Sequence, residues 1–545
     1  MKRAAGFTSL LVGSFLLLSL LSGCGSSLQG SVTSTTPDTS STTGDEVTAP
    51  AVGGQVSVLT LDSDSSEIVF SDIEEDDEIL LMLHAYSDAG ASSSFQIGAS
   101  ENMMFLEKEI LGEEVEAEEG DATVAFHDIL RQYEEQLDEG ALLGDGGAKS
   151  AKYLIKKATV GYQKSFKVLN SFSSSSSYDT VIATLRYVTS DFEIYVDNRN
   201  ATTVTQADLS EIAERFAAVL PLEKEIFGEE SDVDANNKFA VLLTQTVNEL
   251  GGSAGGMITG FFYAVDLFDS DQYAISNEME VFYTFVPDPE GELGSSVSKD
   301  FAMTNIYPGV LAHEFQHVIN FNMHYNINGG SMEKNWLNEG LSHLAEDIYS
   351  HDSDGYMTTA GLENPARVSS YLSDISNICF TCGTSLKERG GSYLFLRYLY
   401  EQAELGNLAN VDTGNELLTA LLDTDLRGTE NVVNAVFGST AVEEDFNTLL
   451  GLFGLTVYLS NTGNSNDDRF GFTGLNLRAA QDDNRGTVLD GPAVQSITDL
   501  PFVETISGSG FAYLQISGKT IIENGGRLDF SFGSNSTFGG YMIRE

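Results

Sequence analysis

Two histidines four residues apart constrain this chain more than any other feature of its sequence. His313 and His317 lie in an apolar stretch that begins just after Pro308. This pattern predicts a helix, because proline suits a first turn and the apolar residues recur on one side. Residues four apart share a helix face, so the two imidazoles can approach one metal ion, while Glu314 can reach a water held at that ion. The fold must therefore bury this helix and turn its polar edge toward a cleft.

A third ligand is expected from a second helix. A catalytic zinc site needs three protein ligands and one open position. The residues that share the apolar side of the next helical pattern are Leu337, Leu341, Leu344 and Ile348. Glu339 and Glu346 lie on another side of that pattern. We predict that Glu339 is the third ligand and that Glu346 orients a ligand histidine. Five of the seven histidines lie between His313 and His351, which favours a metal site over a chance motif.

The motif residues resemble those of a known class of zinc peptidases. The segments 313–317 (HEFQH) and 336–342 (WLNEGLS) are similar to the gluzincin metallopeptidases, and most of all to the hyicolysin family. The likeness extends over about residues 180–460. It implies that His313, His317 and Glu339 bind one Zn²⁺ ion, that Glu314 is the catalytic base, and that the substrate is a protein or peptide. The thermolysin branch has an aspartate four residues after the third ligand, whereas this chain has His343 there.

The expected mechanism is hydrolysis of a peptide bond. Glu314 would take a proton from zinc-bound water as the water attacks the carbonyl, and would pass it to the departing amine. Tyr393 and His343 are candidates to stabilise the oxyanion, and the alternative for Tyr393 is packing in the core. Two other functions stay open. One is a non-catalytic, surface-binding lipoprotein with a structural zinc site, and the other is a zinc hydrolase with a substrate other than peptides.

The amino terminus predicts export and a lipid anchor. Lys2 and Arg3 precede an apolar run over 10–21 that is too short to span a membrane comfortably, and small residues then lead to Cys24. This is the pattern of a bacterial lipoprotein signal peptide over 1–24, with Cys24 as the lipidated residue and membrane anchor. Gly25 follows, with no aspartate to signal inner-membrane retention, so the outer membrane or the cell surface is favoured.

The predicted fold is multidomain. An α+β gluzincin-like catalytic domain over 178–465 is flanked by an N-terminal β-rich domain over 55–100 and a C-terminal β domain over 475–545. A Ser/Thr-rich linker occupies 25–54. The acidic helical segment over 101–177 is either a removable inhibitory propeptide or a helical spacer. In this class of fold, a sheet edge commonly holds the substrate backbone.

The cysteine spacing predicts a disulfide, and the net charge limits the classes of molecule that the chain can bind. Cys379 and Cys382 are spaced as C-x-x-C, and in an exported chain they predict a local disulfide. The net charge of −53 repels phosphates, so we expect no nucleic-acid partner.

One acidic loop predicts either calcium or a capped turn. Asp232, Asp234 and Asn236 stand at alternate positions, as the oxygen ligands of Ca²⁺ would. The loop has no glycine at the sixth position and no glutamate at the twelfth, so it is not an EF-hand. A turn capped by these side chains explains the same pattern.

Overall fold

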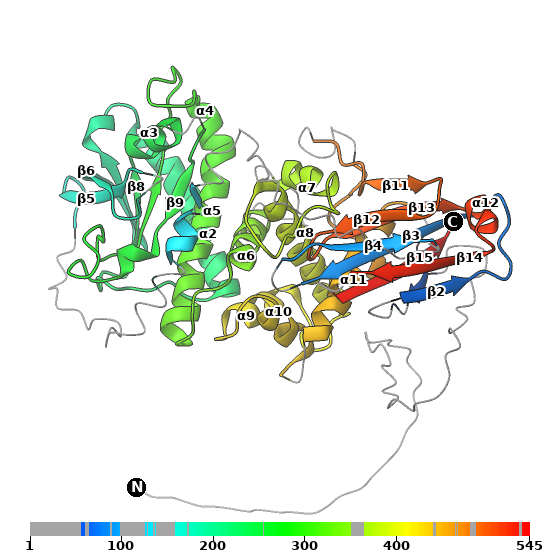
Figure 1. The fold of residues 1–545 in the computed structure, drawn as a ribbon. Coiled ribbons are helices and arrows are strands. Elements are labelled where there is room, and N and C mark those ends of the chain that lie inside the picture. Colours follow the sequence, from blue (N-terminus) through cyan, green and yellow to red (C-terminus); the bar gives the residue numbers. More distant parts are fainter. Residues whose placement is uncertain are drawn as a thin grey trace, which may run out of the picture.

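The described part of the chain has a sheet region at each end, with helices between them. The computed structural model describes residues 56–59, 61, 65–87, 90–98, 126–127, 129–134, 137, 158–171, 174–253, 256–349, 364–439, 443–463, 465, 467–479, 487–533 and 537–545. The predicted signal peptide, Cys24 and the linker lie outside these residues. Figure 1 shows a mixed sheet at one end, a β-sandwich at the other, and helices α6 to α11 between them. The multidomain α+β layout is confirmed.

The mixed sheet has six strands in the order β5-β6-β7-β8-β10-β9. Their bounds are β5 Gln163–Leu169, β6 Tyr178–Val188, β7 Phe192–Asp197, β8 Phe239–Leu243, β9 Gly260–Phe262 and β10 Val281–Thr284. Strands β7, β8 and β10 are parallel, and β9 runs antiparallel to β10 at the edge. The sheet begins before the predicted domain boundary at 178, because β5 pairs with β6 from Gln163↔Thr184 to Leu169↔Tyr178.

Apolar packing joins the sheet to the motif helix. Helix α2 (Gln206–Phe227) starts at a capping box in which Thr205 and Asp208 satisfy each other's backbone amides. Its Phe216 contacts Phe315 of α5 (Tyr307–Phe321), with ring centroids 5.8 Å apart, and Phe315 also contacts Phe239 of β8 at 5.4 Å. These contacts bury the apolar side of α5 against the sheet, and the polar side of α5 faces away from the sheet.

Helix α5 is the middle of a longer helical run. π-Helical turns over Ala302–Ile306 and Asn322–Ile327 precede and follow it. The other helices are α3 Gln245–Ser253, α4 Lys299–Phe301, α6 Asn335–Tyr349, α7 Asn364–Leu372, α8 Leu386–Glu404, α9 Gly414–Leu422, α10 Gly428–Phe437 and α11 Glu443–Leu459. Among the described residues, no helix combines the length and the apolar composition that crossing a membrane requires.

Helices α6 and α8 cross closely at Gly340. A Cβ atom at this position would lie 2.8 Å from Leu396 Cδ1 and 3.3 Å from the backbone of Ser392. Glycine is therefore needed immediately after Glu339, because a larger residue would push the two helices apart.

The two predicted β domains form one sandwich. One sheet has the order β1-β15-β3-β13-β11, and the facing sheet has the order β12-β4-β14-β2. The strands are β1 Val56–Leu59, β2 Ser65–Val69, β3 Glu78–Tyr86, β4 Ser93–Ile97, β11 Val494–Ile497, β12 Phe502–Ile506, β13 Phe511–Ser517, β14 Arg527–Phe532 and β15 Thr537–Arg544. Each sheet thus mixes strands from both ends of the chain, so the prediction of two separate β domains was wrong.

One short β-branched run within the predicted C-terminal β domain is a helix. Residues 520–522 lie in α12 (Gly518–Glu523), where the Ser517 hydroxyl accepts a hydrogen bond from the Thr520 amide. This cap favours a helical turn over an extended β-branched run.

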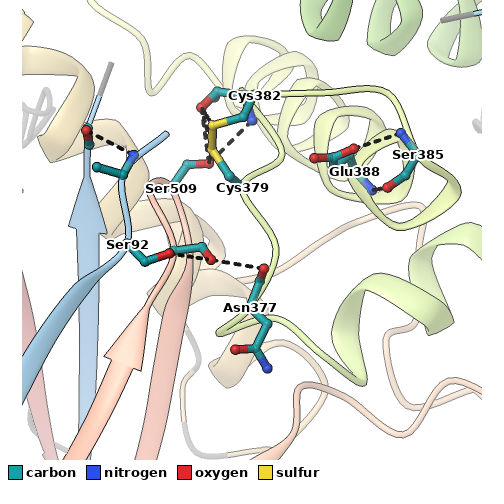
Figure 2. The surroundings of a disulfide bond; sticks show 11 residues. Ser92, Asn377, Cys379, Cys382, Ser385, Glu388 and Ser509 are labelled. Atoms are coloured by element: carbon teal, nitrogen blue, oxygen red, sulfur yellow. Dashed lines mark hydrogen bonds between the residues drawn. A yellow bond between two sulfur atoms is a disulfide. The ribbon is translucent and has the colours of Figure 1, made fainter. Parts of the chain in front are cut away.

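The predicted disulfide forms where the helices meet the sandwich. Cys379 and Cys382 are bonded to each other in the turn between α7 and α8. Figure 2 shows Ser509 of the sandwich beside this disulfide, with its hydroxyl 3.5 Å from Cys379 Sγ. The Ser507 hydroxyl donates to the Asn377 carbonyl at 3.0 Å. The disulfide turn therefore docks the helical layer onto the sandwich.

Candidate metal centre

The structure brings the three predicted metal ligands together. Helix α5 supplies His313 and His317, whose Nε2 atoms are 3.2 Å apart. Helix α6 supplies Glu339, whose Oε2 lies 3.5 Å from His313 Nε2 and whose Oε1 lies 3.6 Å from His317 Nε2. All three side chains are buried. Two nitrogens and a carboxylate thus converge from two packed helices, as the sequence predicted.

The carboxylate of Glu339 is suited to a cation. It is fully buried, and its two oxygens lie 2.9 to 3.6 Å from nitrogens of Arg389, Arg131 and the two histidines. Burial alone would raise its pKa, but the Arg389 guanidinium, with Nη1 2.9 Å from Oε2, and the two histidines hold the pKa of Glu339 well below its ordinary value. The carboxylate is therefore kept ionised, and a His, His, Glu set is one that zinc prefers.

The outer nitrogens of both histidines have fixed partners. His313 Nδ1 lies 2.8 Å from Glu346 Oε1, and His317 Nδ1 lies 2.9 Å from Asn338 Oδ1. Because these oxygens accept a hydrogen bond from Nδ1–H, each ring keeps its Nε2 lone pair for a metal. Burial lowers the pKa of His313, but hydrogen bonds to Glu339 and Glu346 raise it to about 9. The carboxylates of Glu339 and Glu346 therefore favour positive charge at His313.

Glu314 is held beside the ligands by the edge strand. Its Oε2 accepts a hydrogen bond from the Phe262 amide of β9 at 2.8 Å. The side chain is 2 % exposed. Burial raises the pKa of Glu314, and the charges of His313 and Arg131 oppose that rise. The helix therefore places this carboxylate between the ligand cluster and the edge of the sheet.

The two oxyanion candidates are both engaged in buried contacts. The Tyr393 hydroxyl donates to Asp347 and accepts from Arg397 Nη1 at 2.8 Å. Both hydrogen-bonding roles of this hydroxyl are thus used in a buried network between α6 and α8, which fits the core-packing alternative. His343 Nδ1 lies 2.9 Å from Glu346 Oε1, and burial lowers the pKa of His343 to about 3.

Three residues at the centre were not predicted from the sequence. The sequence contained a clue to Asn338, because this residue directly precedes the expected ligand Glu339 on the same helix. Arg389 comes from α8 and Arg131 from residues 126–137, and Arg131 Nε lies 3.4 Å from Glu339 Oε1. Neither arginine has a spacing that ties it to the motif, so only the tertiary fold reveals them.

The predicted acidic loop gains a further carboxylate in the structure. Carboxylate oxygens of Asp232, Asp234 and Glu280 lie within 4.8 Å of one another. Asn236 instead donates its side-chain amide to Asp234 Oδ2 at 2.8 Å, and the Asn237 amide donates to Asp232 Oδ1 at 3.0 Å. These bonds are those of a capped turn. Calcium binding by Asp232, Asp234 and Asn236 stays a prediction, and Glu280 adds a carboxylate to this group.

Comparison with known proteins gives one informative similarity. No protein-family model matches the chain. The chain is 24% identical over 297 residues to the neutral metalloprotease ShpI of Staphylococcus hyicus. The match covers 53% of this chain and 61% of that protein, so the chain spans about three-fifths of the length of this curated relative. This similarity supports a metallopeptidase family for the chain.

Proposed function

We propose that this chain is a zinc-dependent metallopeptidase that hydrolyses peptide bonds in proteins or peptides. One observation carries the proposal. Ligand atoms of His313, His317 and Glu339 lie 3.2 to 3.6 Å apart, and the buried carboxylate of Glu314 interacts electrostatically with His313 and Glu339. The similarity to a neutral metalloprotease supports the same activity.

The residues of the candidate site have distinct roles in the proposed reaction. His313, His317 and Glu339 would hold the ion, with Glu346 and Asn338 fixing the two rings. Zinc, when bound, supplies a Lewis acid that polarises a peptide carbonyl and acidifies water.

Glu314 is the proton carrier. The Phe262 amide fixes its Oε2, which leaves Oε1 to take a proton from water and return it to the departing amine. Its raised pKa suits a group that must both accept and release a proton near neutral pH.

The test compares wild type with Glu314→Gln. We expect both proteins to retain one zinc ion per chain, because Glu314 is outside the ligand set, and only the wild type to cleave casein or a peptide library in a chelator-sensitive way. Zinc without cleavage in the wild type would favour the non-catalytic, surface-binding alternative. Cleavage by Glu314→Gln would remove Glu314 from the role of base.

We further propose that the protein is exported and anchored to a membrane through Cys24. The signal-like residues before Cys24 support this, and so does the Cys379–Cys382 disulfide, since disulfides persist in oxidising compartments outside the cytosol. Labelled palmitate should be incorporated by the full chain and not by Cys24→Ser. Equal labelling of the two would refute the anchor.

A further inference from the structure

A cavity beside the disulfide turn has a positive lining in a strongly negative chain. Its volume is about 490 Å³, which is within the range of small-ligand sites, and its walls come from α6, α10, the disulfide turn and the end of β3. Lys334 and Arg427 line it, and none of its lining residues in the described part of the chain is aspartate or glutamate. The chain as a whole has 81 acidic and 28 basic residues. This cavity is called the basic cavity below, because its charge is opposite to that of the whole chain.

The two cations of the basic cavity have no anionic partner. In the part of the chain that the structure describes, neither Lys334 Nζ nor the Arg427 guanidinium makes an ion pair or a hydrogen bond. Arg427 Nε is buried, and a buried donor without a partner costs free energy. An acceptor that enters the basic cavity would therefore recover part of this cost.

The carboxylates closest in the sequence are used by other groups. Glu333 accepts hydrogen bonds from the amides of Lys334 and Gly428, both at 2.6 Å. Glu388 caps α8 and accepts a hydrogen bond from the Ser385 amide at 2.8 Å (Figure 2). Neither carboxylate lies within ion-pair distance of the two cations, so the charge of the basic cavity stays available to a ligand.

Two helices begin at the wall of the basic cavity. Asn335 and Trp336 are the first residues of α6, and Gly428 and Thr429 are the first residues of α10. The N-terminus of a helix carries about half of a positive elementary charge. Both helix ends therefore add to the attraction that Lys334 and Arg427 exert on an anion.

Trp336 adds a neutral donor to the wall. Its side chain is 5% exposed and packs against Phe380 and Phe395, with ring centroids 6.1 and 6.4 Å away. Its Nε1 would lie 3.7 Å from a Cβ atom at Gly428, another residue of the wall. Among the described residues, Nε1 donates to no acceptor. A side chain that is otherwise buried thus offers its single N–H at the wall of the basic cavity.

Two short connections join the basic cavity to the candidate metal centre. Trp336 precedes the predicted ligand Glu339 by three residues on α6, which is about 4.5 Å along the helix axis. Thr384, in the wall, accepts a hydrogen bond at its carbonyl from Arg389 Nε at 2.7 Å, and Arg389 Nη1 lies 2.9 Å from Glu339 Oε2. The basic cavity is therefore next to the candidate site, where one end or one side chain of a bound peptide can enter it.

We propose that the basic cavity is a subsite that binds a carboxylate of the peptide substrate. The carboxylate belongs either to an acidic side chain or to the C-terminus of the peptide. This inference rests on the proposed function, because it takes a peptide as the substrate. Lys334 and Arg427 supply the charge, and the Trp336 indole supplies a directional hydrogen bond.

The test uses the fluorescence of Trp336, which is the single tryptophan of the chain. Three acetylated tripeptides are titrated into the full chain carrying Glu314→Gln. The first has a central glutamate and an amidated C-terminus, the second a central glutamine and a free C-terminal carboxylate, and the third a central glutamine and an amidated C-terminus. We expect the first or the second peptide to bind about tenfold more tightly than the neutral third, and the tighter of the two identifies the source of the carboxylate.

The variant that tests the assignment combines Lys334→Gln with Arg427→Gln. Its matched control combines Lys519→Gln with Arg527→Gln, which makes the same change in net charge at side chains that are 64% and 49% exposed. We expect the first pair to abolish the preference for a carboxylate and the control pair to keep it. If the first pair lowers the melting temperature, Lys334→Glu alone replaces it, because this side chain is exposed and the reversed charge should repel the same carboxylate.

The outcomes separate this inference from the proposed function. Equal binding of the three peptides would overturn the subsite, and so would a carboxylate preference that survives in a folded Lys334 and Arg427 variant. Carboxylate-selective binding by a chain that cleaves no peptide with Glu314 intact would support the basic cavity and overturn the peptidase proposal.

Discussion

Glu346 offers the sharpest test of how the metal centre is held. Its Oε1 accepts hydrogen bonds from two buried imidazoles, at 2.8 Å from His313 Nδ1 and 2.9 Å from His343 Nδ1. We consider Glu346→Gln, which keeps the shape of the side chain and an acceptor oxygen but removes the charge. The substitution changes the support of a ligand without changing any ligand.

The expected magnitude follows from these two contacts. A hydrogen bond to a charged group contributes about 1.5–3 kcal/mol, against about 0.5–1.5 for a neutral pair. Losing roughly 1 kcal/mol at each of two bonds weakens the site by about 2 kcal/mol. That corresponds to a zinc dissociation constant raised about 30-fold, within the range of about 10- to 100-fold typical for partners of metal-bound histidines.

Competition with a fluorescent zinc chelator measures this constant. Glu249→Gln, on the solvated side of α3, is the matched control, because its side chain is 42% exposed. Activity at saturating zinc should fall much less than the zinc affinity, since Glu346 positions a ligand and does not contact the substrate. A zinc affinity within about threefold of wild type, in a protein with unchanged melting temperature, would refute the role assigned to Glu346.

Two further predictions concern the scaffold. In α2, Glu223 is fully buried with no hydrogen-bond partner among the described residues, and burial raises its pKa well above 4.5. The folded state thus favours the protonated acid, so the protein loses stability as the pH rises from about 4.5 toward the pKa of Glu223 in the folded state. Glu223→Met should raise the free energy of unfolding by about 1–3 kcal/mol at pH 7.5, measured by urea unfolding. The substitution should also flatten this pH dependence of stability. An equal gain in Glu225→Met, on the exposed side of α2, would contradict this. Gly340→Ala should cost about 1–3 kcal/mol and weaken zinc binding, because its Cβ would press on Leu396 beside Glu339. Gly471→Ala, with open space around the glycine, is the control, and equal losses in the two would remove the helix crossing as the cause.

Local patterns in the sequence predicted the elements well. The apolar run 239–243 indicates a strand and is β8, and the apolar run 390–399 indicates a buried helix and lies within α8. Helical periodicity was also enough to place Glu346 beside a ligand histidine, because both helices and their facing sides could be inferred from the motif. These features depend on residues within a few turns of one another.

Pairings between distant segments could not be predicted in the same way. Short apolar runs mark β3 and β13 as strands, but such a run does not say which strand pairs with which. The ion pair of Arg389 with Glu339 and the contact of Arg131 with the same carboxylate join three segments that are far apart in the chain. Such contacts leave no periodic signal in a single sequence.

The position of β3 has a consequence for how the protein is made. This strand lies between β15 and β13, so a ribosome delivers it hundreds of residues before either neighbour exists. Eight of its nine residues are buried in the complete fold. While the catalytic unit is synthesised, these residues have no neighbouring strand to pair with. Contacts of such high sequence separation form slowly, and unpaired apolar strands aggregate. The sandwich is therefore completed only after strands β11 to β15 are synthesised, and a nascent chain stalled before β11 should depend on a holding chaperone to remain soluble.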